Sequence, residues 1–151
     1  MKVGNKAPNF KILNENGRSV NIKDFNGRKT VLYFYCKDST SGCTIESKDF
    51  AKNYDKFKKK NAEVVGVCIG TLESHKKFKD DLKLPFNLLV DEDAKVSKRY
   101  GVWNEKNFLG NKYMGIERTT FIINEDGRIE KIFPKVKVVG HWKEVLNSIK
   151  H

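Results

Sequence analysis

Apolar residues fall along the chain in short runs that predict alternating strands and helices. Two continuous β-prone runs, at 29–36 and 62–70, are typical of strands buried on both faces. Phe50, Tyr54 and Phe57 recur at helical spacing after the first of these runs. The whole pattern predicts, in chain order, a hairpin at 10–22, a strand at 29–36, a helix at 43–60, a strand at 62–70, a helix at 71–84, a strand at 87–91, a helix at 93–102, a hairpin at 117–134 and a helix at 141–150.

The order of these elements predicts an α/β fold with a mixed central sheet flanked by helices. Alternating strands and helices in the middle of the chain imply parallel strands joined by right-handed crossovers, and the late hairpin adds antiparallel strands. This is a thioredoxin-like layout, here with an N-terminal β-hairpin extension. Because the chain has 151 residues and no repeat, low-complexity tract or linker, residues 1–151 are expected to form a single domain.

Composition narrows the class of protein. The net charge is +11, with lysines spread over nearly every segment and one cluster at 56–60 that ends a predicted helix. The few arginines are scattered rather than gathered with aromatics, so no nucleic-acid partner is expected. The first ten residues lack the apolar stretch of a signal peptide, and no apolar run approaches the roughly 18 residues of a membrane span. We therefore expect a cytoplasmic protein without membrane contact.

The three cysteines indicate thiol chemistry rather than a disulfide framework, because an odd number in a small chain suits a reducing compartment. Cys36 and Cys43 are too far apart for the Cys-x-x-Cys redox motif. Cys43 follows the first central strand across a short loop, and Thr40 is a natural N-cap that would make Cys43 the third helical residue. Such a position favours the reactive thiolate, although a small residue filling the first helical turn is the plainer alternative.

Two further side chains favour a reactive site over a filler. Glu46 lies one helical turn after Cys43 and could hold an arginine in place. Arg118 opens a late strand that could lie beside the first central strand. A carboxylate-oriented arginine next to a thiolate is suited to a small polar oxygen substrate.

Several segments together resemble a known family. They read VGNKAPNF, VLYFYCKDSTSGCTIE, ESHKKF, LPFNLLVD, YGVW, YMGIERTTFII and VKVVGH, and they are similar, nearly from end to end, to the bacterioferritin-comigratory or Q-type branch of the peroxiredoxins. The resemblance implies a thiol-dependent peroxidase that reduces hydrogen peroxide and alkyl hydroperoxides in antioxidant defence. It also implies an external thiol reductant such as thioredoxin, no metal or organic cofactor, and a monomer or weak dimer.

The resemblance assigns roles to four residues. Cys43 becomes the peroxidatic cysteine, which attacks the peroxide and is oxidised to a sulfenic acid. The hydroxyl of Thr40 bonds the peroxide oxygens. Arg118 stabilises the charge that develops on the leaving oxygen, and Glu46 orients Arg118.

Three positions depart from the family pattern. Cys36 replaces the proline of Pro-x-x-x-Thr-x-x-Cys, Ser41 replaces a proline common at the helix start, and Lys48 replaces a common resolving cysteine. Cys36 is then either an inert replacement or a resolving or redox-tuning thiol. Cys68 either fills the core or acts as the resolving thiol. Because Lys48 closes the local route, we favour one-cysteine chemistry, in which an external thiol reduces the sulfenic acid.

Two other functions are alternatives. A thiol–disulfide oxidoreductase is disfavoured by the absence of Cys-x-x-Cys from the sequence. A basic binding or chaperone module would leave Cys43 without a role. His75 and His141 lack cysteine partners at zinc-site spacing, and both are expected to be surface or helix-capping residues.

Overall fold

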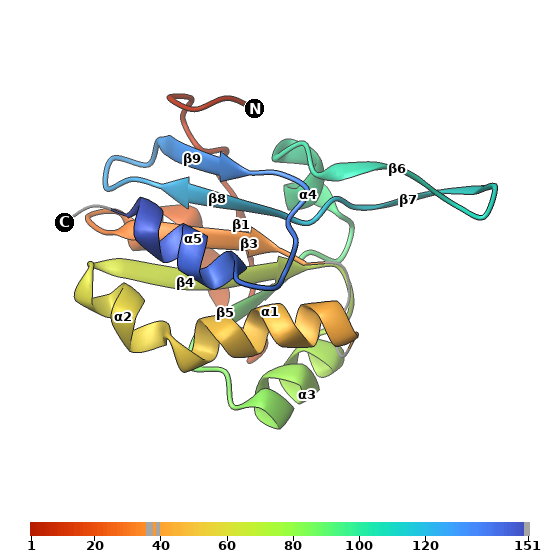
Figure 1. Cartoon of the computed structure of the whole chain (residues 1–151), viewed down its shortest axis with the longest axis horizontal. Coiled ribbons are helices and arrows are strands. Elements are labelled where there is room, and N and C mark those ends of the chain that lie inside the picture. Colours follow the sequence, from red (N-terminus) through yellow and green to blue (C-terminus); the bar gives the residue numbers. More distant parts are fainter. Residues whose placement is uncertain (36–37, 39, 150–151) are drawn as a thin grey trace.

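The computed structural model describes residues 1–35, 38 and 40–149. Its centre is a five-stranded sheet (Figure 1), formed in spatial order by β5 (Asn87–Val90), β4 (Ala62–Cys68), β3 (Lys29–Phe34), β8 (Thr119–Ile123) and β9 (Ile129–Phe133). β3 pairs in parallel with β4, and β4 in parallel with β5. β8 pairs antiparallel with both β3 and β9. The predicted mixed sheet, with its late antiparallel hairpin, is confirmed.

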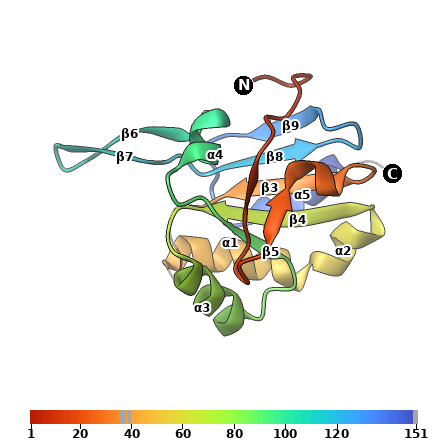
Figure 2. The ribbon, with the colours of Figure 1, turned by 180° about the vertical axis from the view of Figure 1, so that it is seen from behind.

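Different elements cover the two faces of the sheet. One face carries the helices α1 (Ser41–Lys52), α2 (Tyr54–Lys59) and α5 (His141–Ser148), with α3 (Leu72–Leu82) near the β5 edge (Figure 1). The other face, turned to the viewer in Figure 2, carries the predicted N-terminal hairpin of β1 (Lys11–Leu13) and β2 (Ser19–Asn21), the 3₁₀ helix η1 (Ile22–Phe25) and the helix α4 (Lys95–Arg99). In the described part of the chain, no helix is long and apolar enough to cross a membrane.

Each face of the sheet buries its own apolar cluster, and β3 contributes to both. Val31 and Tyr33 of this strand, with Tyr35 just beyond it, belong to the cluster beneath α1 and α5. Leu32 and Phe34 belong to the cluster on the opposite face. Side chains of a strand alternate between faces, so a run without polar residues is what burial on both faces requires. The first apolar run is therefore confirmed as a central strand.

The single helix predicted over 43–60 is wrong, because the structure divides it into α1 and α2 at Asn53. The backbone of Asn53 has φ −107° and ψ 12°, outside the helical range. Its side-chain amide donates to the carbonyl oxygen of Asp49 at 2.8 Å. An asparagine side chain that bonds the local backbone competes with the regular helical ladder, which accounts for the break.

A second hairpin, not among the predicted elements, reaches out from the body of the molecule (Figures 1 and 2). It consists of β6 (Trp103–Phe108) and β7 (Asn111–Ile116), paired antiparallel. Its two turn residues, Leu109 and Gly110, have φ values of 51° and 84°. Two positive φ values in a two-residue turn normally call for Asn-Gly or Asp-Gly, and leucine in the first position hides this signal.

Both histidines, expected to be surface or helix-capping residues, are buried, so the surface alternative is wrong, although His141 lies at the start of the last helix as predicted. His75 on α3 is fully buried, one turn before the buried Phe78 on the same helix face. His141 begins α5, with Nε2 2.7 Å from Oγ1 of Thr120 in β8 and Nδ1 2.6 Å from Oε1 of Glu144. Each ring is kept in the interior by polar partners, some of which lie on other elements and are not apparent from the local pattern.

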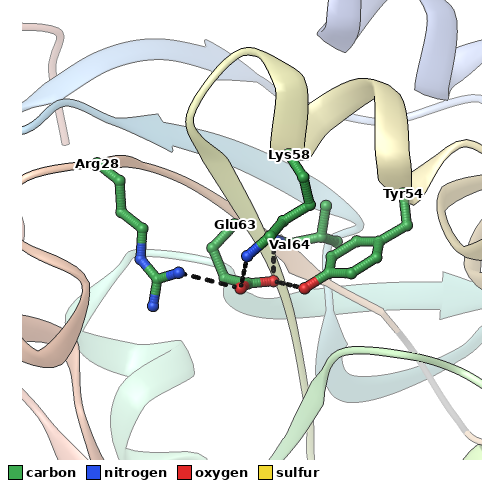
Figure 3. A network of polar contacts seen from close by, with 5 residues as sticks. All are labelled: Arg28, Tyr54, Lys58, Glu63 and Val64. Carbon is green, nitrogen blue, oxygen red and sulfur yellow. Dashed lines mark hydrogen bonds and ion pairs between the residues drawn. The ribbon is translucent and has the colours of Figure 1, made fainter.

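A hydrogen-bond network forms around the carboxylate of Glu63 near the start of β4. Glu63 accepts hydrogen bonds from the Tyr54 hydroxyl at 2.6 Å, from Lys58 Nζ at 3.2 Å, from Arg28 Nη1 at 3.3 Å and from the Val64 backbone N–H at 3.0 Å (Figure 3). Four donors satisfy a carboxylate that is otherwise mostly withdrawn from water. The network ties α2 and the segment before β3 to the sheet.

Candidate active site

Cys43 lies at the start of α1, as the sequence predicted. Thr40 is the N-cap with extended backbone, so Ser41 is the first helical residue and Cys43 the third. The Cys43 side chain is fully buried in the cluster beneath α1. Thr40 Oγ1 accepts no hydrogen bond from the first turn of α1, all of which the structure describes, whereas its carbonyl accepts one from Thr44 N at 2.8 Å. The backbone N–H groups of this turn and the helix dipole favour negative charge on the sulfur.

Arg118 brings a guanidinium directly to this sulfur. Arg118 Nη2 donates to Cys43 Sγ at 3.2 Å, across 75 residues of sequence. The contact follows from the register of the sheet, since Thr119 at the start of β8 pairs with Phe34 at the end of β3. The carbonyl of Arg118 is also held, by a hydrogen bond from Val136 N at 2.9 Å. A fixed cation beside the sulfur favours the thiolate over the thiol.

Gly42, which the sequence analysis did not single out, makes room for the arginine. A Cβ at Gly42 would lie 2.9 Å from Arg118 Nη1 and 3.2 Å from Nη2. Glycine is a poor helix former, so its presence inside the first turn was the available signal. The absence of a side chain at this position allows the guanidinium to pass close to the helix.

Glu46 is buried one turn after Cys43, but it does not reach Arg118. Its residue is 1% exposed, and among the described residues neither carboxylate oxygen has a hydrogen-bond partner. Burial raises the pKa of Glu46 to about 8, against the attraction of Arg118 and with the repulsion of Cys43. The orienting role of Glu46 therefore stays a prediction that rests on charge and proximity.

The structure covers the candidate resolving positions in part. Cys68 is the last residue of β4 and is fully buried in the same cluster as Cys43. Lys48, at the common resolving position, is exposed on α1. Cys36 lies outside the described residues. The choice between resolving thiols thus stays a prediction.

No cluster in the described part of the chain suggests a metal centre. Groups of three or more His, Cys, Asp or Glu side chains that could hold an ion do not occur among those residues. The chemistry that this arrangement supports is nucleophilic attack by a cation-stabilised thiolate.

Known proteins share this sequence and architecture. A family model described as the AhpC/TSA family matches residues 3–132. Peroxiredoxin Bcp of Bacillus subtilis (strain 168) is 42% identical over 150 residues, which cover 99% of this chain and 96% of that protein.

Solved structures agree with the sequence relatives. The bacterioferritin comigratory protein of Xanthomonas campestris matches with a TM-score of 0.89 at 34% identity, covering 93% of this chain and 89% of that one. A mutant of PrxQ from Xylella fastidiosa matches with a TM-score of 0.93 at 34% identity, covering 98% and 94%. The thioredoxin-like fold is thereby confirmed, and the chain belongs to the AhpC/TSA family as a peroxiredoxin of the bacterioferritin-comigratory, Q-type branch.

Proposed function

We propose that this peroxiredoxin, a thiol-dependent peroxidase, reduces hydrogen peroxide and alkyl hydroperoxides with Cys43 as the reacting thiol. The observation that carries the assignment to Cys43 is the 3.2 Å contact between its sulfur and Arg118 Nη2 at the start of α1. The Xanthomonas campestris relative is described by its alkyl peroxide reduction activity, which supports the wider substrate range.

The reaction at Cys43 is a displacement at oxygen. The thiolate sulfur forms an S–O bond while the O–O bond of the peroxide breaks, so sulfur loses two electrons and the peroxide gains them. The leaving oxygen departs as hydroxide or alkoxide and takes a proton from water. Arg118 and the N–H groups of the α1 start stabilise the charge as it moves from sulfur to this oxygen. Cys43 is left as a sulfenic acid.

Thr40 and Glu46 have supporting roles in this proposal. Thr40 is the residue at the helix entrance, and its hydroxyl donates to a peroxide oxygen. Glu46 acts on Arg118 through its charge, because the two are electrostatically coupled within a buried region. Its influence depends on ionisation, which burial makes difficult near neutral pH.

Reduction of the sulfenic acid is proposed to use an external thiol. The thiol sulfur displaces water from the sulfenic acid to give a mixed disulfide, and a second thiol then releases Cys43. Cys68 would have to leave a fully buried position at the end of β4 to compete, and Lys48 offers no sulfur. Cys36 or Cys68 as resolving thiol is the alternative, and oxidised protein would then carry an internal disulfide.

We further propose a single-domain enzyme, monomeric or weakly dimeric, that works in the cytoplasm without nucleic-acid or membrane partners. The Bacillus subtilis relative supports the domain assignment, since the match covers 96% of its length. Sedimentation of the purified chain tests the oligomeric state.

Replacing Cys43 by serine tests the central assignment. Cys43→Ser is expected to abolish peroxide consumption with dithiothreitol or thioredoxin, while Cys68→Ser, the matched control at another buried thiol, keeps it. Intact mass after one equivalent of peroxide should show one added oxygen atom in wild type and none in Cys43→Ser. Undiminished turnover by Cys43→Ser would show that another group reacts with the peroxide.

A further inference from the structure

A second polar cluster lies beside the active site and takes no part in the chemistry above. Its centre is Asp38, between β3 and α1 and two residues before the N-cap Thr40. The Asp38 carboxylate is 4% exposed, and it accepts hydrogen bonds from the Tyr35 hydroxyl at 2.7 Å and from Ser74 Oγ at 2.6 Å. His75 Nδ1 lies 2.8 Å from Asp38 Oδ2, at an ion-pair separation.

Both members of this pair have further polar partners. His75 Nε2 lies 3.1 Å from two carbonyl oxygens, those of Cys68 and Leu89, and carbonyl oxygens only accept hydrogen bonds. Nε2 therefore carries a proton. Although burial opposes ionisation, the contacts with His75, Ser74 and Tyr35 hold the pKa of Asp38 below its usual value. His75 Nδ1 and Asp38 Oδ2 face each other at 2.8 Å, an ion-pair separation, without the N–H geometry of a regular hydrogen bond.

The surroundings exclude water from this ion pair. The His75 residue is fully buried, and the Tyr35 ring lies 6.1 Å from the imidazole and stacks on Phe78 at 5.7 Å. A Cβ at Gly70 would lie 3.4 Å from the imidazole and 4.0 Å from Asp38 Oδ2. Removing one member of a buried ion pair leaves the other charge without compensation, so such a pair fixes its members strongly.

The cluster joins the segment before α1 to three other elements, α3, β4 and β5. Asp38 belongs to the segment entering α1, whereas His75 and Ser74 belong to α3. The carbonyl groups bound by His75 come from the end of β4 and from β5. Asp38 lies two residues before the N-cap Thr40, so the cluster holds the chain directly ahead of the helix turn that carries Cys43.

We propose that the Asp38–His75 ion pair is a positioning device for the peroxidase reaction, which fixes the segment entering α1 so that Thr40 and Cys43 face Arg118. This inference rests on the proposed function of Cys43. Neither member contacts the reacting atoms, and both act through the placement of the helix start. A displacement of about 1 Å in a reacting group can cost about 100-fold in rate. A small displacement of the start of α1 should therefore cause a measurable loss in the rate of peroxide reduction.

Asp38→Asn and His75→Gln test the proposal, with Glu63→Gln as the matched control. Glu63 is also a buried carboxylate with several donors (Figure 3). It pairs with Thr30 near the start of β3, whereas Asp38 follows the end of that strand. Two rates are measured on the full chain, both resolved at Cys43 by peptide mass spectrometry. One is sulfenic acid formation by hydrogen peroxide, and the other is alkylation by iodoacetamide.

The two rates are expected to change in opposite directions. Asp38→Asn and His75→Gln should slow sulfenic acid formation by about 10-fold to 100-fold. They should also speed alkylation of the buried Cys43 by at least about 10-fold, because the helix start opens more often. Glu63→Gln should leave both rates within about twofold of wild type at a temperature where every variant is folded.

Two milder variants keep the test available if the first two do not fold. Ser74→Ala and Tyr35→Phe each remove one neutral donor to Asp38, and each should shift both rates in the same directions by about threefold. Rates in the Asp38 and His75 variants that match those of Glu63→Gln would overturn the proposal. Should wild-type Cys43 fail to react with peroxide, the proposed function would fall, while the alkylation rates would still decide whether this ion pair fixes the helix start.

Discussion

Gly42 at the start of α1 lowers the stability of the helix but leaves space for Arg118 beside the Cys43 thiol. Gly42→Ala is expected to raise the free energy of unfolding by about 0.5–1 kcal/mol, because alanine is the better helix former. The same change is expected to slow peroxide reduction by at least about 10-fold. A Cβ only 2.9 Å from Arg118 Nη1 displaces the guanidinium that stabilises the leaving oxygen.

Thermal unfolding and the rate of sulfenic acid formation check the two halves of this prediction. Ser41→Ala is the matched control, since Ser41 is exposed in the same helical turn. It should leave the rate of peroxide reduction unchanged. A wild-type rate in Gly42→Ala would mean that the arginine does not depend on the space above Gly42.

Glu46 makes the stability of the fold depend on pH. Its pKa is about 8 in the folded chain against 4.5 as the ordinary value, so the folded state binds this proton more tightly than the unfolded state. The resulting stabilisation is present below about pH 4.5 and is lost as the pH rises through about 8. Relative to Glu46→Gln, wild type should lose up to about 1.4 kcal/mol of unfolding free energy per pH unit in this window. Urea denaturation at about pH 6 and about pH 8 measures the difference. Equal slopes in the two proteins would contradict the raised pKa.

Residue types at fixed spacing predicted the position of the thiol well. The Thr40 N-cap and the third helical position of Cys43 follow from local backbone rules, and the proximity of Arg118 follows from its place at a strand start. The sequence indicated Gly42 only through the poor helix propensity of glycine, and it could not indicate Asp38, because the contacts of both residues involve side chains on distant elements. The spacing of residues along the sequence carries no information about contacts between distant elements.

Among the elements, the β6–β7 hairpin has an unfavourable residue at its tip. Leu109 is 87% exposed and has φ 51°, a backbone region that asparagine accepts more readily than leucine. Leu109→Asn would create an Asn-Gly turn and should stabilise the protein by about 0.5–1 kcal/mol without loss of core packing. Thermal or urea unfolding measures this gain. Leu109→Gln removes the same apolar surface without the backbone preference and should give a clearly smaller gain. Equal gains would mean that the loss of exposed apolar side-chain area, and not the backbone preference of asparagine, stabilises the protein.

The predicted and observed elements differ where side chains override the apolar pattern. The pattern found the central strands because β3 alternates between two apolar clusters and is apolar or aromatic from Val31 to Phe34. It missed the break at Asn53, since the apolar spacing of Phe50 and Phe57 continues across it. Periodicity records which face is buried, and it does not record where the backbone leaves the helix.

At the scale of the whole molecule, the reactive site depends on strand order. Cys43 follows a strand from the parallel part of the sheet, and Arg118 precedes a strand from the antiparallel part. β3 lies at the boundary between these two parts, so the carboxyl end of β3 and the beginning of β8 meet at one edge of the sheet. The mixed layout predicted from element order was therefore sufficient to bring the arginine to the thiol. The polar clusters at the two ends of β4, around Glu63 and around Asp38 and His75, could be recognised only in the folded structure.

The 75-residue separation between Cys43 and Arg118 has a consequence for biosynthesis. A ribosome makes the thiol long before it makes the guanidinium, and the two meet only when β8 has joined β3. A nascent chain that ends before Arg118 carries a cysteine with no such cation beside it, and its reactivity is that of an ordinary thiol. The contribution of Arg118 to the reactivity of Cys43 is therefore acquired only when the sheet is complete.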